Sequence, residues 1–539
     1  MDYITVLKPL IKHLPLNIAL KIQFTNSFSS EMILLITISL LIIIHWIYQY
    51  AISDIKLRKF NLPPGPKAWP LFGVLPSLVG KVALEEFHKW SDVYGGMYFC
   101  KIGVHNIVVV TDARVANNMT INQPDKFSQR PKDLLLGRIL GNKGIPFNDG
   151  PSWKEHRMFV VQEFRKFGLT KPEVESRIHD EVQIFLEKLS KGTGEPTSIN
   201  TYLATVTYNI IWSVISGQRF NWDDKQLSNL FKNMEANLDA VEIVGAHNYF
   251  LPLMAYQLVR NNPPKLLKIV ISRFMYFNTL INSCQNRQEE EEDVISENMI
   301  FDYLKELNQR KKTNKGTTFS RTQLLFMVSD LFVAGGETTI TTLQWSVLFL
   351  ALYPEWQEKV REEIRTVYGK ERLPSYSEKS SCPILEAFIS ESLRYRTATA
   401  AMWHSTTEDC KVDGYDIPAN TWVLFHFQGM HNNKDNWPER DVFNPGRFLS
   451  DGVYKKNELF LPFSSECDQT GERVIAASHN VRRTLDSGIH QIQSSALNRG
   501  LDRSIILPLQ NLYKKLKTRI KVPTIDGPQI SVVVVPEKK

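Results

Sequence analysis

The chain has 539 residues, an apolar content of 43% and a formal net charge of +7, so it holds roughly two to four average domains or one unusually large one. Its basic residues are dispersed, whereas nucleic-acid-binding proteins usually concentrate them into a stripe, so we expect no nucleic-acid partner. Its cysteines are sparse and far apart, which excludes a Cys-x-x-Cys zinc site and argues against a disulfide scaffold: Cys100, Cys284, Cys382, Cys410 and Cys467.

Residues 32–52, MILLITISLLIIIHWIYQYAI, are long and apolar enough to cross a membrane. About 20 residues at 1.5 Å each span a hydrocarbon core of about 30 Å. Interfacial aromatic residues and then a basic cluster follow its apolar centre: Trp46, Tyr48, Tyr50, Lys56, Arg58 and Lys59. A secretory signal peptide is the alternative, but about 30 residues precede the segment and no small-residue cleavage site follows it. We therefore predict a single-pass anchor, with residues 1–31 on the lumenal side and the body in the cytosol.

Residues 53–73 form a basic and then proline-rich stretch that ends in LPPGPKAWPLFG. Its prolines hold the backbone extended and exclude a helix. We predict a stiff hinge between the membrane and a globular body.

Helical patterns dominate the body, residues 74–463. Residues 324–353 are apolar on nearly all sides, which predicts a buried central helix, and residues 355–369 alternate charges as a surface helix does. Short strands are predicted in residues 97–112 and 410–427.

Two charged runs, residues 287–293 and 308–316, interrupt the helical patterns and are predicted to be solvated loops. No internal repeat is present. The predicted fold class is mainly α with a minor β part, as one large domain behind an N-terminal transmembrane helix.

The stretch AGGETT, from Ala334 to Thr339, interrupts the apolar helix with small and polar residues. Each glycine costs a helix about 1 kcal/mol relative to alanine, so something must need the space. Thr338 can bond back to a carbonyl one turn earlier, and Glu337 is costly to bury unpaired. The group indicates a ligand notch with a proton relay. A glycine contact between two helices, with a capping threonine, is the alternative.

Three further motifs place charged residues in patterns that are weak alone. ESLRYR sets Glu391 and Arg394 one helical turn apart, a spacing usual for a surface ion pair. FNPGRFL places Arg447 in an aromatic, proline-rich coil. SWKEHRMF puts Trp153 and Arg157 on one helix face, where an indole N–H and a guanidinium can bind one anionic group, although simple stacking is the commoner outcome.

Together and in this order, the anchor, the proline hinge, Trp-x-x-x-Arg, Ala-Gly-x-x-Thr, Glu-x-x-Arg and the Arg447 coil resemble the cytochrome P450 family of haem-thiolate monooxygenases. The resemblance runs from about Leu62 to Phe463 and is closest to the microsomal branch with drug- and steroid-hydroxylating members. It implies an enzyme of the endoplasmic reticulum membrane that uses haem b to insert one oxygen atom from dioxygen into a lipophilic substrate. Electrons are expected from NADPH through a separate reductase, because the chain has no Gly-x-Gly-x-x-Gly nucleotide motif after a strand.

The resemblance also implies roles for single residues. Glu337 and Thr338 match the acid–alcohol pair that delivers protons to dioxygen. Trp153 and Arg157 match the helix that holds a haem propionate, and His404 matches a position that often binds a propionate too.

On the other side of the haem, Glu391, Arg394 and Arg447 match a structural network. The family's substrate contacts correspond to residues 130–147, to the helix before the AGGETT motif and to residues 397–403. These segments are apolar enough for a lipophilic substrate.

The resemblance breaks at the loop that should carry the iron ligand. In the family a phenylalanine opens this loop, and glycine, arginine, the ligand cysteine and glycine follow at the third, fifth, seventh and ninth positions after it. Here the phenylalanine is Phe463, and those positions hold Glu466, Asp468, Thr470 and Glu472. Cys467, the nearest cysteine, comes three residues early. Residues 464–521 do not resemble the family helix that should follow, whereas residues 522–539 are predicted to form a terminal β-hairpin.

Two explanations stay open. A local stretch has been replaced in an otherwise ordinary member, as a splice variant or a gene-model artefact, or the chain has lost its iron chemistry and acts as a haem-free binding or interaction protein at the membrane. The intact Glu337–Thr338 pair favours the first, because a chain freed from catalysis should tolerate alanine there. The pair also counts against a haem isomerase that needs no reductase. We predict that the chain as written does not bind haem through a properly placed thiolate.

Overall fold

The computed structural model describes residues 54–463 except 79–80, 104, 133–140, 167–171, 191–196, 223–264, 291–297, 314–316 and 370–371, together with Val533–Val534 and part of residues 41–52. It is mainly helical with small sheets, as the sequence predicts. The main helices are α4 (Ala83–Tyr94), α7 (Gly150–Lys166), α8 (Pro172–Ser190), α9 (Ile199–Ser216), α12 (Lys265–Glu290), α13 (Met299–Lys312), α14 (Arg321–Leu352), α15 (Pro354–Tyr368) and α16 (Pro383–Tyr395), with short helices α3 (Leu75–Leu78), α5 (Ala113–Asn117) and α17 (Phe427–His431).

The principal sheet has four strands in the order β1-β2-β7-β4. Its strands are β1 (Met97–Ile102), β2 (His105–Val110), β7 (Trp422–Phe425) and β4 (Met402–Ser405). β1 and β2 form an antiparallel hairpin, β7 pairs with β2 in parallel, and β4 pairs with β7 antiparallel. Two smaller hairpins follow in the chain: β5 (Cys410–Val412) with β6 (Tyr415–Ile417), and β8 (Leu449–Ser450) with β9 (Val453–Tyr454). The predicted strands are therefore confirmed, whereas β4 was not predicted.

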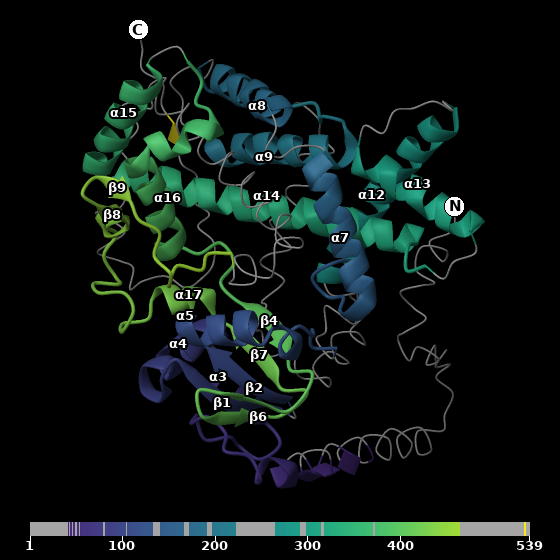
Figure 1. Ribbon diagram of the computed structural model, residues 1–539, viewed down its shortest axis with the longest axis vertical. Helices are drawn as coiled ribbons and strands as arrows, with labels where there is room; N and C mark the ends of the chain where they lie inside the picture. The colour runs from purple at the N-terminus through teal and green to yellow at the C-terminus, as the bar shows by residue number, and fades with distance from the viewer. Residues whose placement is uncertain are drawn as a thin grey trace, which may run out of the picture.

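Helix α14 runs through the middle of the helical part, with α8 and α9 along one side and α7 crossing in front, while α15 and α16 lie towards one end and α12 and α13 towards the other (Figure 1). The side chain of Ser320 caps its first turn by accepting the Gln323 N–H at 3.1 Å. The largest apolar core cluster surrounds it, with buried aromatic members such as Trp212, Phe277, Phe332 and Phe388. The predicted buried central helix is confirmed, because a helix that is apolar nearly all round needs neighbours on every side.

The prediction of loops at the two charged runs was partly wrong. Residues 287–290 belong to the end of α12, and α13 continues to Lys312. The last turn of α13 holds Arg310, Lys311 and Lys312, where positive charge interacts favourably with the helix dipole. The first part of the charged run 308–316 therefore forms the last turn of α13 and does not interrupt the helix.

The proline-rich stretch forms no helix, as predicted, and is hydrogen-bonded to the sheet, but it is not extended throughout, because Trp69 and Gly73 close a turn by two backbone hydrogen bonds. The Phe99 N–H donates to the Pro64 carbonyl at 2.9 Å, and the Val74 N–H donates to the Lys101 carbonyl at 2.7 Å. Gly65 permits this approach, because a Cβ there would lie 1.8 Å from the Phe99 carbonyl oxygen. The body end of the hinge is therefore fixed to β1.

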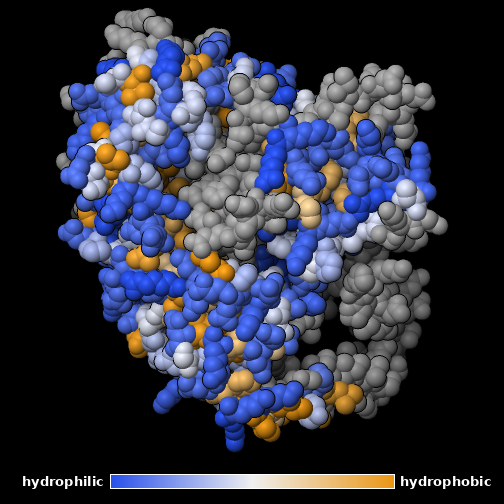
Figure 2. All heavy atoms as spheres, in the orientation of Figure 1, coloured by the Kyte–Doolittle hydropathy of each residue, from blue (hydrophilic) through white to orange (hydrophobic). Residues whose placement is uncertain are grey.

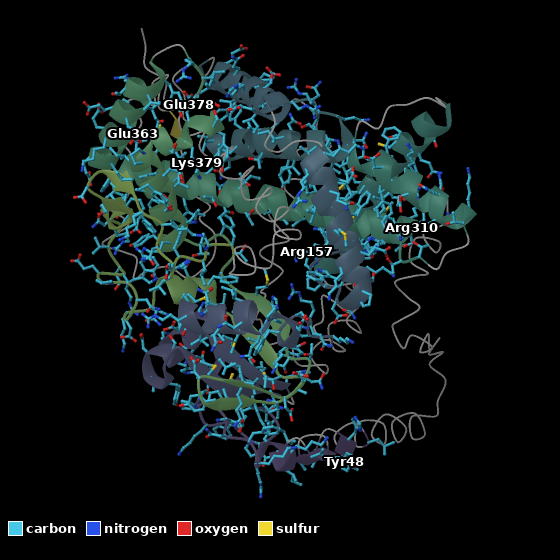
Figure 3. The ribbon with its side chains drawn as sticks, in the orientation of Figure 1. Tyr48, Arg157, Arg310, Glu363, Glu378 and Lys379 are labelled. Carbon is cyan, nitrogen blue, oxygen red and sulfur yellow. The ribbon has the colours of Figure 1, made fainter. Side chains whose placement is uncertain are left out.

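Most of the predicted anchor, residues 32–52, lies outside the described residues. Its described positions are helical and include exposed apolar or aromatic side chains: Leu41, Ile44, Ile47 and Tyr48. Figure 3 labels Tyr48 at the lower edge of the molecule, where Figure 2 shows hydrophobic residues on the surface. Within the described part of the chain, α14 is the one helix long and apolar enough to cross a membrane, and 56% of its apolar window is buried. Since its neighbours cover it, we assign α14 to the core.

Cys467 and the atypical segment 464–521 lie outside the described residues, as does most of the predicted hairpin 522–539. Within the latter, β10 (Val533–Val534) pairs antiparallel with β3 (Thr197–Ser198), directly before α9. The end of the chain thus returns to the body as a strand, while the hairpin itself stays a prediction.

Candidate active site

Ala334 lies on an accessible face of α14, although the helix is buried at most other positions. Ala334 is exposed, whereas its neighbours Gly335 and Gly336 are buried. Thr338 is one turn further along and shares the face of Ala334. An exposed small residue in the middle of a core helix marks an open space beside the helix. This face is the candidate active site.

The two glycines serve a different contact, with α9. A Cβ at Gly336 would lie 2.0 Å from Cε1 of Tyr208, and a Cβ at Gly335 would lie 2.9 Å from Cδ1 of Ile211. At Gly336 this approach requires glycine, whereas at Gly335 the flexible end of Ile211 can move. The contact between helices that the sequence left as the alternative is therefore present, and the accessible space lies on the Ala334 face instead.

Thr338 and Glu337 have different hydrogen-bond partners. The Thr338 hydroxyl donates to the Ala334 carbonyl at 2.7 Å, which is the back-bond that the sequence predicts. Oε1 of Glu337 accepts a hydrogen bond from the Tyr208 hydroxyl at 2.6 Å. Both side chains are half-buried. The acid is thus held on the α9 side, and the alcohol stays on the face of Ala334.

The loop before α7 is fastened to α14 just before the AGGETT motif. The Ile145 N–H donates to Asp330 at 2.9 Å, and Gly144 exchanges two hydrogen bonds with Gln323 at 3.0 and 3.3 Å. Gly144 has φ +79°, and a Cβ there would lie 1.9 Å from Oδ2 of Asp330, so this position requires glycine. Burial raises the pKa of Asp330 to about 7. The described end of the predicted substrate loop, residues 130–147, therefore lies against α14.

Trp153 and Arg157 lie on one face of α7, as predicted, and stack. The Arg157 guanidinium lies 4.9 Å from the centre of the Trp153 ring. Both side chains are half-buried, and Figure 3 labels Arg157 in the middle of the molecule. In the described part of the chain, neither the indole N–H nor the guanidinium has a hydrogen-bond acceptor. The pair can therefore still donate to an anionic group while it stacks.

His404, on β4, is buried and binds Arg130. Its Nδ1 lies 2.7 Å from the Phe127 carbonyl, to which it donates, so Nε2 is left to accept from Nη1 of Arg130 at 2.6 Å. Nε of Arg130 also donates to the Pro146 carbonyl at 3.1 Å. His404 thus orients an arginine that the sequence analysis did not assign. The one local signal for Arg130 is its place at the start of the predicted substrate loop.

Glu391 and Arg394 are fully buried, so the expectation of a surface ion pair from their spacing alone was wrong. Nε and Nη2 of Arg394 donate to the Glu391 carboxylate at 2.7 and 2.9 Å, and Nε of Arg447 donates to the same carboxylate at 3.1 Å. Arg394 also donates to the carbonyls of His431 and Arg440. Removing one partner of a buried pair typically costs about 3–5 kcal/mol. The network therefore ties α16 to the Arg447 coil.

A thiolate ligand for iron needs a cysteine that can lose its proton. The described cysteines are all buried: Cys100, Cys284, Cys382 and Cys410. Burial raises the pKa of Cys100 to about 12 and the pKa values of Cys382 and Cys410 to about 11. Among the described residues, no group of three or more metal-binding side chains occurs. Trp153 and Arg157 can donate hydrogen bonds to the carboxylates of a porphyrin. The buried Cys100, Cys382 and Cys410 are poor ligands for its iron, because their raised pKa values disfavour the thiolate.

The comparisons with known proteins agree with these motifs. The family model Cytochrome P450 matches residues 63–465. Cytochrome P450 2J1 of Oryctolagus cuniculus is 31% identical over 415 residues, which cover 76% of this chain and 80% of the relative. Cytochrome P450 2C8 of Homo sapiens is 30% identical over 433 residues, which cover 79% of this chain and 86% of the relative. The match to the family model includes every site residue described above and ends beside Phe463, where the sequence departs from the haem-loop pattern.

Proposed function

Since the chain belongs to the microsomal branch of the cytochrome P450 family, we propose that its body is built as a membrane-anchored monooxygenase acting on a lipophilic substrate. Electrons come from NADPH through a separate reductase. The cofactor of the family is haem with thiolate-bound iron, which supplies the oxygen-activating chemistry when it is bound. The observation that carries the proposal is the accessible face of Ala334 and Thr338 in the middle of an otherwise buried helix.

Donors on two parts of the chain are assigned to the haem propionates. Arg130 is held at the start of the loop by two hydrogen bonds, to His404 and to the Pro146 carbonyl. Trp153 and Arg157 offer an indole N–H and a guanidinium from α7. A planar guanidinium matches the geometry of a carboxylate, which supports this assignment.

Glu337 and Thr338 are assigned to proton delivery. The Thr338 hydroxyl lies on the accessible face, where its oxygen can accept a hydrogen bond while its proton is donated to the Ala334 carbonyl. To pass a proton on, the hydroxyl turns away from this carbonyl and donates to the accessible face instead. Glu337 is adjacent in the chain and exchanges the proton with the interior of the protein. Positioned acid–base groups of this kind typically contribute about 100- to 10,000-fold to a rate.

An apolar cluster lies between the loop and the first half of α14, which supports a lipophilic substrate. Phe147 of the loop and Leu325 of α14 pack against a cluster made by Phe274 and Phe326. The centroids of the Phe274 and Phe326 rings lie 4.6 Å apart. A substrate that enters between this loop and α14 meets aromatic and aliphatic side chains.

The membrane assignment rests on residues 32–52 and on the basic cluster behind them. The exposed apolar side chains of Leu41, Ile44 and Ile47 support it, because an apolar surface of this kind marks contact with lipid or a partner. Protease added to sealed microsomes should digest the body and spare residues 1–31. Full protection of the body would contradict the cytosolic orientation.

Catalysis is tested with a restored-loop form, which carries the family residues at the four departing positions: Glu466→Gly, Asp468→Arg, Thr470→Cys and Glu472→Gly. With reductase, NADPH and isotopically labelled dioxygen, this form should place one labelled oxygen atom in a lipophilic product. If this form consumes NADPH but oxygenates none of a broad set of lipophilic compounds, the proposal is contradicted.

A second candidate function is that of a haem-free relative that binds a ligand or a partner at the membrane. One observation favours it for the chain as written. Cys467 lies between Glu466 and Asp468, and two carboxylates disfavour a thiolate. The two candidates differ in one measurable property, the presence of haem on the purified chain.

A further inference from the structure

Tyr208, on α9, makes a contact with the acid–alcohol pair that the sequence motifs do not predict. Its hydroxyl donates to Oε1 of Glu337 at 2.6 Å. Its ring is fully buried and stacks on Phe332 of α14, with the ring centroids 4.4 Å apart and the planes 17° from parallel. The tyrosine is therefore fixed at both ends, by its ring and by its hydroxyl.

Gly336 makes this arrangement possible. A Cβ at Gly336 would lie 2.0 Å from Cε1 of Tyr208, 2.4 Å from Cζ and 2.8 Å from Cδ1. The ring thus fills the space that the missing side chain leaves. Since Glu337 is the next residue in the chain, the hydroxyl of the same ring reaches its carboxylate. The second glycine of the AGGETT motif and Tyr208 form one packing unit.

The charges around Glu337 keep the phenol in its donor form. Burial, together with the neighbouring Glu337 carboxylate, raises the pKa of Tyr208 well above its ordinary value. Arg273 of α12 also interacts with Tyr208, and Asp330 of α14 lies close enough to interact with Arg273. Arg273 is the cation among them, and it interacts with Tyr208, Glu337 and Asp330. The phenol therefore stays protonated and donates to the carboxylate.

We propose that Tyr208 is a positioning residue for Glu337: its hydroxyl holds the carboxylate against α9 and so fixes the side from which the acid–alcohol pair exchanges its proton. The proposal rests on the proposed monooxygenase function for its catalytic meaning, but the contact itself needs no haem. Thr338 keeps the accessible face, and Glu337 faces the interior between α9, α12 and α14. In this arrangement Glu337 takes up its proton on the side of α9, and Thr338 delivers a proton on the accessible face of α14.

The contact is tested on the full chain as written, by a double-mutant cycle of thermal unfolding with Tyr208→Phe and Glu337→Leu. Each single variant should lower the midpoint, because it removes the hydrogen bond between the buried Tyr208 hydroxyl and the Glu337 carboxylate. The double variant should unfold no lower than Glu337→Leu alone, because it removes both polar groups together. Tyr98→Phe is the matched control, since it removes a buried hydroxyl that donates to the Phe87 carbonyl at 2.7 Å in another part of the fold. The proposal would be overturned if the midpoint shifts of Tyr208→Phe and Glu337→Leu simply add in the double variant, as the shifts of Tyr98→Phe and Glu337→Leu are expected to do.

The positioning role is tested in the restored-loop form. Tyr208→Phe should raise the share of NADPH that ends in peroxide, in the direction of Thr338→Ala, with an unchanged KM for the substrate. An unchanged peroxide share would overturn the role. If the restored-loop form makes no product with Tyr208 intact, the proposed function has failed, and the unfolding cycle still decides whether Tyr208 holds Glu337.

Discussion

Nη1 of Arg130 lies 2.6 Å from Nε2 of His404, across 274 residues of sequence. His404 donates its other ring nitrogen to the Phe127 carbonyl, which fixes the ring and leaves Nε2 as an acceptor. The histidine was expected to bind an anionic group itself. In the structure His404 orients Arg130, and we propose the Arg130 guanidinium as a donor for the propionate.

Arg130→Gln should speed haem loss from the restored-loop form. A hydrogen bond to a charged group is worth about 1.5–3 kcal/mol, which corresponds to about 10- to 100-fold in the rate of loss. Transfer of haem to an excess of apomyoglobin measures this rate. His404→Phe should have a smaller effect in the same direction, because Arg130 loses its orientation but keeps its charge. Equal rates for Arg130→Gln and for the exposed control Arg372→Gln would contradict the assignment.

Thr338→Ala should uncouple the restored-loop form. Product should fall by about 10- to 1,000-fold and peroxide should rise, while haem content stays nearly unchanged. Thr339→Ala is the matched control, because the buried Thr339 makes the same back-bond, to the Gly335 carbonyl at 2.7 Å, away from the accessible face. Thr338→Ser should restore coupling. If Thr338→Ala and Thr339→Ala behave alike, the threonine has only a structural role.

Gly335→Ala and Gly336→Ala should differ in stability. At Gly335 the added methyl meets the flexible end of Ile211, so the gain of about 1 kcal/mol in helix propensity offsets most of the crowding. At Gly336 the methyl meets the buried ring of Tyr208, which Phe332 holds in place, and overpacking costs about 1–3 kcal/mol. Thermal unfolding of the full chain compares them. Equal midpoints would mean that α9 does not pack on Gly336 as described.

Asp330 should make the stability of the chain fall as pH rises. Burial raises its pKa in the folded state to about 7, from 3.8. Between these values the folded state holds a proton that the unfolded state has released, so unfolding becomes more favourable with increasing pH. Asp330→Asn keeps an acceptor for the Ile145 N–H and removes this titration. The stability of the unmodified chain relative to Asp330→Asn should therefore decrease from pH 5 to pH 8, and an increase would contradict the conclusion that burial outweighs the Ile145 and Arg273 contacts of this carboxyl group.

Local patterns were enough to predict α14, α15 and the strands β1 and β2, because the periodicity of their apolar residues sets which faces are buried. β4 was missed, since its four residues, MWHS, carry no alternation and become a strand through pairing with β7. The burial of Glu391 and Arg394 is likewise not local. It depends on Arg447 and on the carbonyls of His431 and Arg440, which a helix of this spacing does not reveal.

Candidate site residues could be proposed from the sequence where a motif contains them, but not where only the fold brings them together. Glu337 and Thr338 stand out because glycines and an acid are costly in an apolar helix. Tyr208 and Arg130 do not stand out in the sequence. Their proposed roles depend on hydrogen bonds to Glu337 and to His404, which join residues far apart in the sequence and exist only in the folded chain.

Cys467 is not placed to serve as the thiolate ligand of a haem iron. A catalytic thiolate needs positive or hydrogen-bonding surroundings, whereas Cys467 is flanked by Glu466 and Asp468. It is also three residues early, which can displace it by up to about 10 Å in an extended loop. Glu466 further replaces the family glycine that lets the backbone approach the porphyrin.

The reduced carbon monoxide difference spectrum of the purified chain tests this claim most directly. The chain as written should lack the band that marks the haem-thiolate complex of the family, and the restored-loop form should show it. A strong band of that kind from the chain as written, abolished by Cys467→Ser, would contradict the account.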